Sequence, residues 1–170
     1  MGRNESGSGA DTRQSTARNG CATTAQTGRA FRRIDAILDR SNIGPLWLKD
    51  PRVAQCIVDA LLKGATDLQF FKLHAFVVMP NHVHALLTPC APMRRITNGL
   101  KGSTARHANL ILSRTNHPFW QDESFDHWVR SGREFQRIWA YIESNPVSAS
   151  LADKPEAWPW SSVSFNLPRL

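Results

Sequence analysis

Two apolar runs that meet at Pro80-Asn81 constrain the fold of this chain more than any other stretch of its sequence. Residues 68–79 are rich in Phe and Val, and residues 82–88 continue with histidines set among apolar residues. Phe and Val favour strands, whereas a Pro-Asn pair favours a turn. The pattern therefore predicts an antiparallel hairpin, with Leu68–Met79 as its first strand.

The second strand of this hairpin carries His82 and His84 with one residue between them. Because side chains alternate between the two faces of a strand, both imidazoles are expected on the same face. Neighbouring buried imidazoles are costly unless something binds them, and neutral imidazole is the commonest protein ligand of a metal ion. A divalent metal is therefore one interpretation. Two hydrogen-bonded histidines at a strand edge are the default for so short a motif taken alone.

Helical periodicity surrounds the hairpin in the sequence. Apolar residues recur every three or four positions in four segments, which are Phe31–Arg40, the run after Asp50-Pro51, Met93–Leu112 and Glu134–Ser144. Asp50-Pro51 is typical of a helix start, with a side-chain acceptor followed by proline at the first helical position. Pro146 is expected to end the last helix, because the residue before a proline avoids the helical region. A short strand is expected at Phe125–Val129.

The composition is typical of one globular domain. The 170 residues suffice for a single core, and we expect a disordered N-terminal tail over residues 1–30 and one domain over residues 31–170. No apolar run approaches the ~20 residues of a membrane span. Three cysteines without a CxxC spacing are expected to be free thiols of a reducing compartment. These features predict a soluble, cytoplasmic protein with no membrane partner.

The charge balance points to a polyanionic partner. Lys and Arg outnumber Asp and Glu by 21 to 14, which gives a net charge of +7 and is typical of nucleic-acid binding. A basic surface kept only for solubility is the alternative. The candidate DNA-binding residues are four basic residues of the Met93–Leu112 helix and two tryptophans near the C-terminus: Arg94, Arg95, Lys101, Arg106, Trp158 and Trp160. The basic residues could equally form a solvated helix face, and the tryptophans could pack on the core.

A second group of candidate residues lies on the last helix. Tyr141 is the only tyrosine of the chain, and Asn145 follows it by one turn on the same helix face. If this face meets His82 and His84, two imidazoles and an amide oxygen could hold a metal with positions open for a phosphate. Tyr141 would then be a nucleophile that the metal activates. Otherwise Tyr141 is an ordinary interfacial tyrosine.

Several motifs resemble one known family. MPNHVHALL, with its His-hydrophobe-His pattern, resembles the HUH motif of the single-tyrosine, IS200-like transposases. YIESNPVSASL, WPWSS, FWQDESFDH and LKGSTAR look like the REP-associated tyrosine transposase branch of that family, in the right order between about Phe31 and Ser162.

This resemblance implies a ferredoxin-like α+β fold, an antiparallel sheet with helices on one face. It implies that His82, His84 and Asn145 ligate Mg²⁺ or Mn²⁺ and that Tyr141 is the nucleophile. Such enzymes nick single-stranded DNA at or near hairpins, leave a 5′-phosphotyrosine and a free 3′ hydroxyl, and typically act as homodimers.

One departure from the family pattern concerns the first strand. Residues 21–30, CATTAQTGRA, have no strand pattern, so we expect the first strand of the sheet to be missing or degenerate. A missing strand would expose an edge of the sheet. The alternative function is therefore a non-catalytic hairpin-DNA-binding relic, which would never attach covalently to DNA. A small metal-binding hydrolase without a DNA role is a third, weaker alternative.

Overall fold

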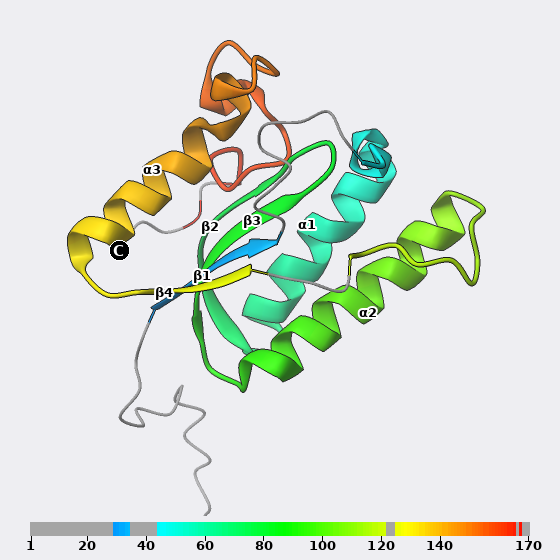
Figure 1. Cartoon of the computed structure of the whole chain (residues 1–170), viewed down its shortest axis with the longest axis horizontal. Coiled ribbons are helices and arrows are strands. Elements are labelled where there is room, and N and C mark those ends of the chain that lie inside the picture. The colour runs from blue at the N-terminus through cyan, green and yellow to red at the C-terminus, as the bar shows by residue number, and fades with distance from the viewer. Residues whose placement is uncertain (1–28, 35–43, 122–124, 166, 168–170) are drawn as a thin grey trace, which may run out of the picture.

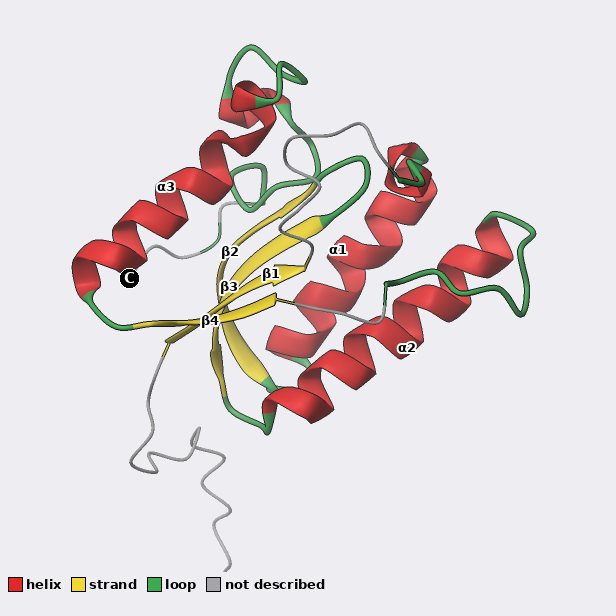
Figure 2. Ribbon diagram, viewed as in Figure 1, coloured by secondary structure: helices red, strands yellow, loops and turns green. Residues whose placement is uncertain are grey.

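The computed structural model describes residues 29–34, 44–121, 125–165 and 167. These residues form a four-stranded antiparallel sheet between two layers of helices (Figure 1, Figure 2). The strands lie in the order β2-β3-β1-β4 and are β1 (Arg29–Ile34), β2 (Phe71–Val78), β3 (Val83–Pro89) and β4 (Phe125–Val129). The helices are α1 (Pro51–Thr66), α2 (Met93–Ile111) and α3 (Gly132–Ser148), with short 3-10 turns η2 (Trp47–Lys49) and η3 (Pro155–Ala157). The predicted α+β, ferredoxin-like antiparallel sheet is confirmed.

The hairpin of β2 and β3 is also confirmed, and its two faces serve two different cores. Val83, Ala85 and Leu87 of β3 pack toward α1 and α2, whereas Leu86 packs toward α3. Because β3 contributes apolar side chains to both faces of the sheet, its sequence is a nearly continuous apolar run. We refer to the two sides of the sheet as the α1/α2 face and the α3 face.

The position of α3 corrects one part of the fold prediction. α1 and α2 cover one face, as expected, but α3 covers the opposite face through Phe135, Ile138, Trp139 and Ile142 (Figure 1). The helices therefore do not all lie on one face of the sheet. The apolar stripe of α3 needed a partner surface, and the α3 side of β2 and β3 provides it.

A β-bulge at His74 adjusts β2 to these two cores. Leu73 pairs with Leu87 and Ala75 pairs with Leu86, so His74 is the extra residue. The bulge allows the buried His74 to face α3, where its ring meets Phe135 edge-on at 5.2 Å. His74 Nε2 also lies 2.8 Å from Thr88 Oγ1, which supports a structural role for this histidine.

Two expectations about the N-terminal segment are wrong. Phe31–Ile34 belong to a strand and not to the helix expected over Phe31–Arg40, and the first strand of the sheet is present. β1 pairs antiparallel with β3 on one side and with β4 on the other. This two-sided backbone pairing outweighs the weak helical spacing of the segment. The strand begins at Arg29, within the expected tail. Residues 35–40 and 1–28 lie outside the described residues.

The helix ends follow local chemistry with one exception. Asp50 caps α1 by accepting the backbone N–H of Arg52 at 2.9 Å, as Asp50-Pro51 predicts. Pro146, however, lies inside α3, which continues to Ser148. In the last turn of a helix a proline removes a single backbone hydrogen bond, so the helix tolerates it there.

Two expectations from the sequence concern the state of the cysteines and the absence of membrane-spanning segments. Cys56 is a free, half-buried thiol whose pKa burial raises. Cys90 is disulfide-bonded, which contradicts the expectation that every cysteine is free. Cys21 lies outside the described residues. Within the part of the chain that the structure describes, no helix has the length and apolarity required to cross a bilayer.

Candidate active site

The two histidines lie at the hairpin turn, on the α3 face of the sheet. His82 precedes β3 and His84 is its second residue, and both side chains are buried. The Nε2 atoms are 3.1 Å apart, and the ring centroids are separated by 4.7 Å. The structure thus brings the two imidazoles together.

Asn81 sets the orientation of the first imidazole. The side-chain oxygen of Asn81 lies 2.7 Å from His82 Nδ1, where it accepts a hydrogen bond from the Nδ1–H tautomer of the ring. A neutral ring with its proton on Nδ1 carries its lone pair on Nε2. The nitrogen that faces His84 is therefore the one that can bind a metal ion.

The spacing of the two nitrogens fits a shared metal ion. Two imidazole nitrogens bound ~2.1 Å from one ion, at angles between a right angle and the tetrahedral angle, lie about 3.0–3.4 Å apart. The observed 3.1 Å falls in this range. It also fits a hydrogen bond from one Nε2–H to the other Nε2. Among the described residues no group of three His, Cys, Asp or Glu side chains that could hold a metal ion includes the pair.

Three contacts hold the turn that carries His82. The Met79 N–H donates to the His82 carbonyl at 2.8 Å and closes the hairpin. From η2, the Leu48 N–H donates to the Pro80 carbonyl at 3.2 Å. On the outer edge of β2, Trp158 Nε1–H donates to the Val78 carbonyl at 3.0 Å.

Tyr141 meets the histidines from α3. Its ring centroid lies 5.5 Å from that of His84, with the planes at 66°. Its side chain is 38% exposed, so the phenol lies at the rim of the buried site. Asn145 follows one turn along α3 and is buried. His82, His84 and Tyr141 are therefore assembled at one place, with Asn145 on the same helix.

The start of α3 is fixed by a local network. Ser131 caps the helix by accepting the Glu134 N–H at 3.1 Å. Glu134 in turn accepts the Arg130 backbone N–H and lies 2.7 Å from Nε2 of His127 on β4. These contacts hold the pKa of the Glu134 carboxyl below its usual range, with the Arg130 N–H as the largest cause. The network joins α3 to β4 and so helps to position Tyr141.

The predicted basic residues of α2 lie away from this site. α2 packs on the α1/α2 face, on the opposite side of the sheet from α3 (Figure 1). The ring of His84 contacts Tyr141 of α3, so the candidate site belongs to the α3 face. Arg94, Arg95 and Arg106 are exposed, and Arg95 stacks over the Phe70 ring at 4.6 Å. Lys101 Nζ donates to the Gln121 carbonyl at 2.7 Å.

The two tryptophans are half-buried and contact different cores. Trp158 packs against the α3-face core, whereas Trp160 packs against the core of the α1/α2 face. The backbone between and after them extends the sheet, because Trp160 O accepts the Val78 N–H and Ser162 N–H donates to Phe76 O. This geometry favours the structural alternative, in which the tryptophans pack on the protein.

The structure adds residues that the sequence interpretation did not include. Asn81 orients His82, Leu48 holds the turn, and His127 with Glu134 fixes the start of α3. Asn81 stands directly beside the HUH motif, so its position was a usable signal. The roles of Leu48 and His127 depend on contacts with distant segments, which no local pattern indicates.

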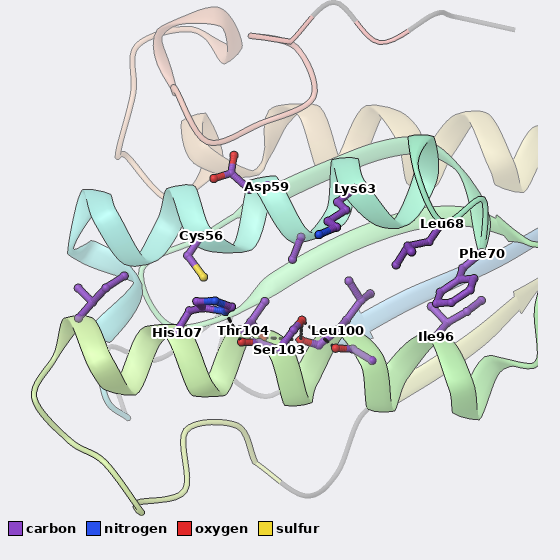
Figure 3. Close-up of a pocket in the computed structure, with 13 residues that line it drawn as sticks. Cys56, Asp59, Lys63, Leu68, Phe70, Ile96, Leu100, Ser103, Thr104 and His107 are labelled. Carbon is purple, nitrogen blue, oxygen red and sulfur yellow. Dashed lines mark hydrogen bonds between the residues drawn. The ribbon is translucent and has the colours of Figure 1, made fainter.

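A cavity of about 550 Å³ lies elsewhere, between α1 and α2 (Figure 3). Cys56 and Lys63 of α1 face His107 and Leu100 of α2 across it. It lies on the opposite face of the sheet from His84 and Tyr141, so it is separate from the candidate active site.

Comparisons with known proteins agree with this arrangement. The family model described as "Transposase IS200 like" matches residues 50–145. The REP-associated tyrosine transposase of Escherichia coli (strain K12) is 24% identical over 119 residues, which cover 68% of this chain and 67% of that protein.

Two solved structures are similar as well. One is a REP-associated tyrosine transposase bound to a REP hairpin, with a TM-score of 0.57 and 18% identity over 82% of this chain and 78% of that one. The other is a putative transposase from Deinococcus radiodurans R1, with a TM-score of 0.44 and 26% identity over 69% of this chain and 88% of that one. The first of these confirms the fold.

Proposed function

Because the chain belongs to the IS200-like transposase family, we propose that it is a metal-dependent single-stranded DNA endonuclease and strand transferase. The relative from Escherichia coli and the similar fold support the relation to the REP-associated branch that the motifs indicate. The observation that carries the proposal is the contact between His84 and Tyr141, with ring centroids 5.5 Å apart.

We propose that DNA with a hairpin is the substrate. The relative of known structure was solved with a REP hairpin, and the net charge of +7 suits a polyanion. The strand β1, which the sequence did not reveal, lies between β3 and β4 and backs the histidine strand. The motivation for a non-catalytic relic is thereby removed.

The residues proposed to hold Mg²⁺ or Mn²⁺ are His82, His84 and Asn145. The 3.1 Å between the two Nε2 atoms and the 2.7 Å contact between His82 Nδ1 and Asn81 support the two histidine ligands. Asn145 is proposed as the third ligand from the family resemblance and from its buried position one turn after Tyr141. The metal, when bound, neutralises charge on the scissile phosphate and favours the phenolate form of the nucleophile.

The nucleophile in this proposal is the phenolic oxygen of Tyr141. It forms a bond to the scissile phosphorus while the bond from phosphorus to the 3′ oxygen breaks. The phenolic proton is lost, and the 3′ oxygen takes up a proton to become the free 3′ hydroxyl. Tyr141 is suited to this role because it is partly exposed at the rim of a buried site. A phenol of ordinary pKa, ~10, is a weak nucleophile at neutral pH, so activation is required.

The test is covalent attachment of labelled hairpin DNA, read on a denaturing gel. With Mn²⁺, wild type should retain DNA labelled at the 3′ end and release DNA labelled at the 5′ end as a shortened product. Tyr141→Phe should abolish both products, because the chain has no other tyrosine. Its DNA affinity should remain, since only one oxygen is removed.

A matched control is Ser148→Ala, which removes a hydroxyl from the exposed last residue of α3. This variant should cleave as wild type does. Equal cleavage by wild type and Tyr141→Phe would show that Tyr141 is not the nucleophile.

A homodimer stays a further proposal from the family resemblance. It is supported by β4, an edge strand of the sheet that carries the 46% exposed Trp128. Sedimentation velocity should give a mass of two chains, and a single-chain mass at micromolar concentration would contradict the dimer.

A further inference from the structure

The exposed side of α3 leads directly to the proposed nucleophile. Arg133, Arg137 and Tyr141 are all exposed and follow one another at intervals of four residues. Residues at this interval form a row along one side of a helix, with steps of ~6 Å along the axis. The two guanidinium groups therefore lie about one and two helical turns before the phenol.

The positive charge of this row is only partly compensated, because Arg137 is attracted to the Glu134 carboxylate three residues earlier on α3. Arg133 and Arg137 form no ion pair within the described part of the chain. The two carboxylates of α3 are only half-exposed and already engaged. Glu134 accepts from the Arg130 N–H and contacts His127, and Glu143 accepts the indole N–H of Trp139 at 2.7 Å.

Two features of this arginine pair are unfavourable for the helix itself. Arg133 lies in the first turn, next to the positive end of the helix dipole, where a cation is unfavourable. Arg133 and Arg137 also repel each other, since like charges four residues apart destabilise a helix. A negatively charged partner on this surface would reverse the sign of both effects.

The neighbouring exposed residues leave room for such a partner. Gln136 and Ala140 are the other exposed residues of this segment of α3. Gln136 is polar, and Ala140 is too small to prevent close approach to Tyr141. Among the residues from 133 to 141, Tyr141 is thus the only large exposed ring.

On the basis of the proposed function, we propose that α3 is the track for the single strand that flanks the scissile phosphate. Arg137 contacts the phosphate next to the one that Tyr141 attacks, and Arg133 contacts the phosphate beyond it. This track lies on the opposite face of the sheet from the basic residues of α2. Substitutions on the two surfaces can therefore be tested separately for their effect on DNA binding.

The test compares Arg133→Gln and Arg137→Gln with Lys63→Gln, a matched loss of one exposed charge on the α1/α2 face. Binding of fluorescent hairpin DNA with single-stranded flanks is measured from low to physiological salt. Each arginine variant should make the log–log salt slope shallower by about 0.7, the contribution of one phosphate contact on a single strand. If the affinities of variant and wild type for DNA converge near 1 M salt, this difference in slope makes the variant bind about fivefold more weakly than wild type at 0.1 M salt.

Further readouts separate the track from a structural role of the arginines. Arg133→Gln should unfold at or above the wild-type temperature, because it relieves repulsion within α3. Arg137→Gln relieves the same repulsion but also loses the attraction to Glu134, so it should unfold near the wild-type temperature. DNA that lacks the single-stranded flank proposed to lie on α3 should bind more weakly to wild type. With this shortened DNA, wild type and Arg137→Gln should have the same affinity. The same truncation identifies whether that flank is the 5′ or the 3′ one.

The track proposal would be overturned if both arginine variants kept the DNA affinity and salt slope of wild type. It would also be overturned if Lys63→Gln lost as much DNA affinity as the arginine variants. Failure of the proposed function has a different signature, the absence of a covalent adduct from wild type on the denaturing gel.

Discussion

Replacing Trp158 by Phe tests how the edge of the sheet supports the histidine turn. Trp158 Nε1–H donates to the Val78 carbonyl at 3.0 Å. β2 is an edge strand, so the WPWSS segment takes the place of a neighbouring strand at this position. Phenylalanine keeps an aromatic ring against the α3-face core and removes the donor.

The expected cost follows from the loss of that donor. A typical hydrogen bond contributes about 0.5–1.5 kcal/mol, and leaving a buried carbonyl without its partner costs about 1–3 kcal/mol. Val78 is buried, so we expect a loss near the upper range, about 2 kcal/mol. For a chain of this size 1 kcal/mol shifts the melting temperature by ~2–4 °C. The melting temperature should therefore fall by about 4–8 °C.

Urea unfolding measures this change as a lower midpoint at an unchanged slope. Cleavage should fall at temperatures where the variant is still folded, because Val78 adjoins Met79, whose N–H closes the turn at His82. Trp160→Phe is the matched control in the same segment. Its indole makes no hydrogen bond among the described residues, and its carbonyl, which accepts from Val78, is retained. Equal stability of the two variants would refute the reasoning.

Three further predictions concern packing, pH and metal binding. Gly64→Ala should destabilise by about 1–3 kcal/mol before helix propensity is counted, because its Cβ would lie 2.7 Å from a buried phenylalanine ring. Gly99→Ala meets nothing within 4 Å and should stabilise by about 0.8–1 kcal/mol; thermal melts that give both changes the same sign would contradict this.

The pKa of Glu134 is lowered in the folded protein, so its stabilisation is present above the ordinary carboxyl pKa and is lost as pH falls through the folded value. Glu134→Gln should flatten that part of the acid unfolding curve, and an unchanged curve would argue against it. Calorimetry should show Mn²⁺ binding to wild type and none to His82→Ala/His84→Ala, whereas equal binding would exclude the proposed ligands.

Local pattern was sufficient for several features that depend on one element, although it placed the end of α3 too early at Pro146. The period of two in a strand placed His82 and His84 on one face, and the structure confirms that they meet. Asp50-Pro51 predicted the start of α1, since capping involves only neighbouring residues. The three- and four-residue spacing of apolar residues likewise predicted the last helix, whose apolar side chains are buried.

Only the tertiary structure decided which elements meet. The sequence could not show that α3 covers the face of the sheet opposite α1 and α2, because an apolar stripe on a helix does not determine which surface it packs against. It gave the wrong element for Phe31–Ile34, whose strand depends on backbone pairing with β3 and β4 on its two sides.

The candidate site also depends on tertiary packing. His84 and Tyr141 were each visible in the sequence, but their contact arises from the packing of α3 against β2 and β3. Periodicity fixes the direction of a side chain because it follows from backbone geometry within one element. The partner of that side chain depends on contacts between distant segments, which only the packed sheet and helices determine.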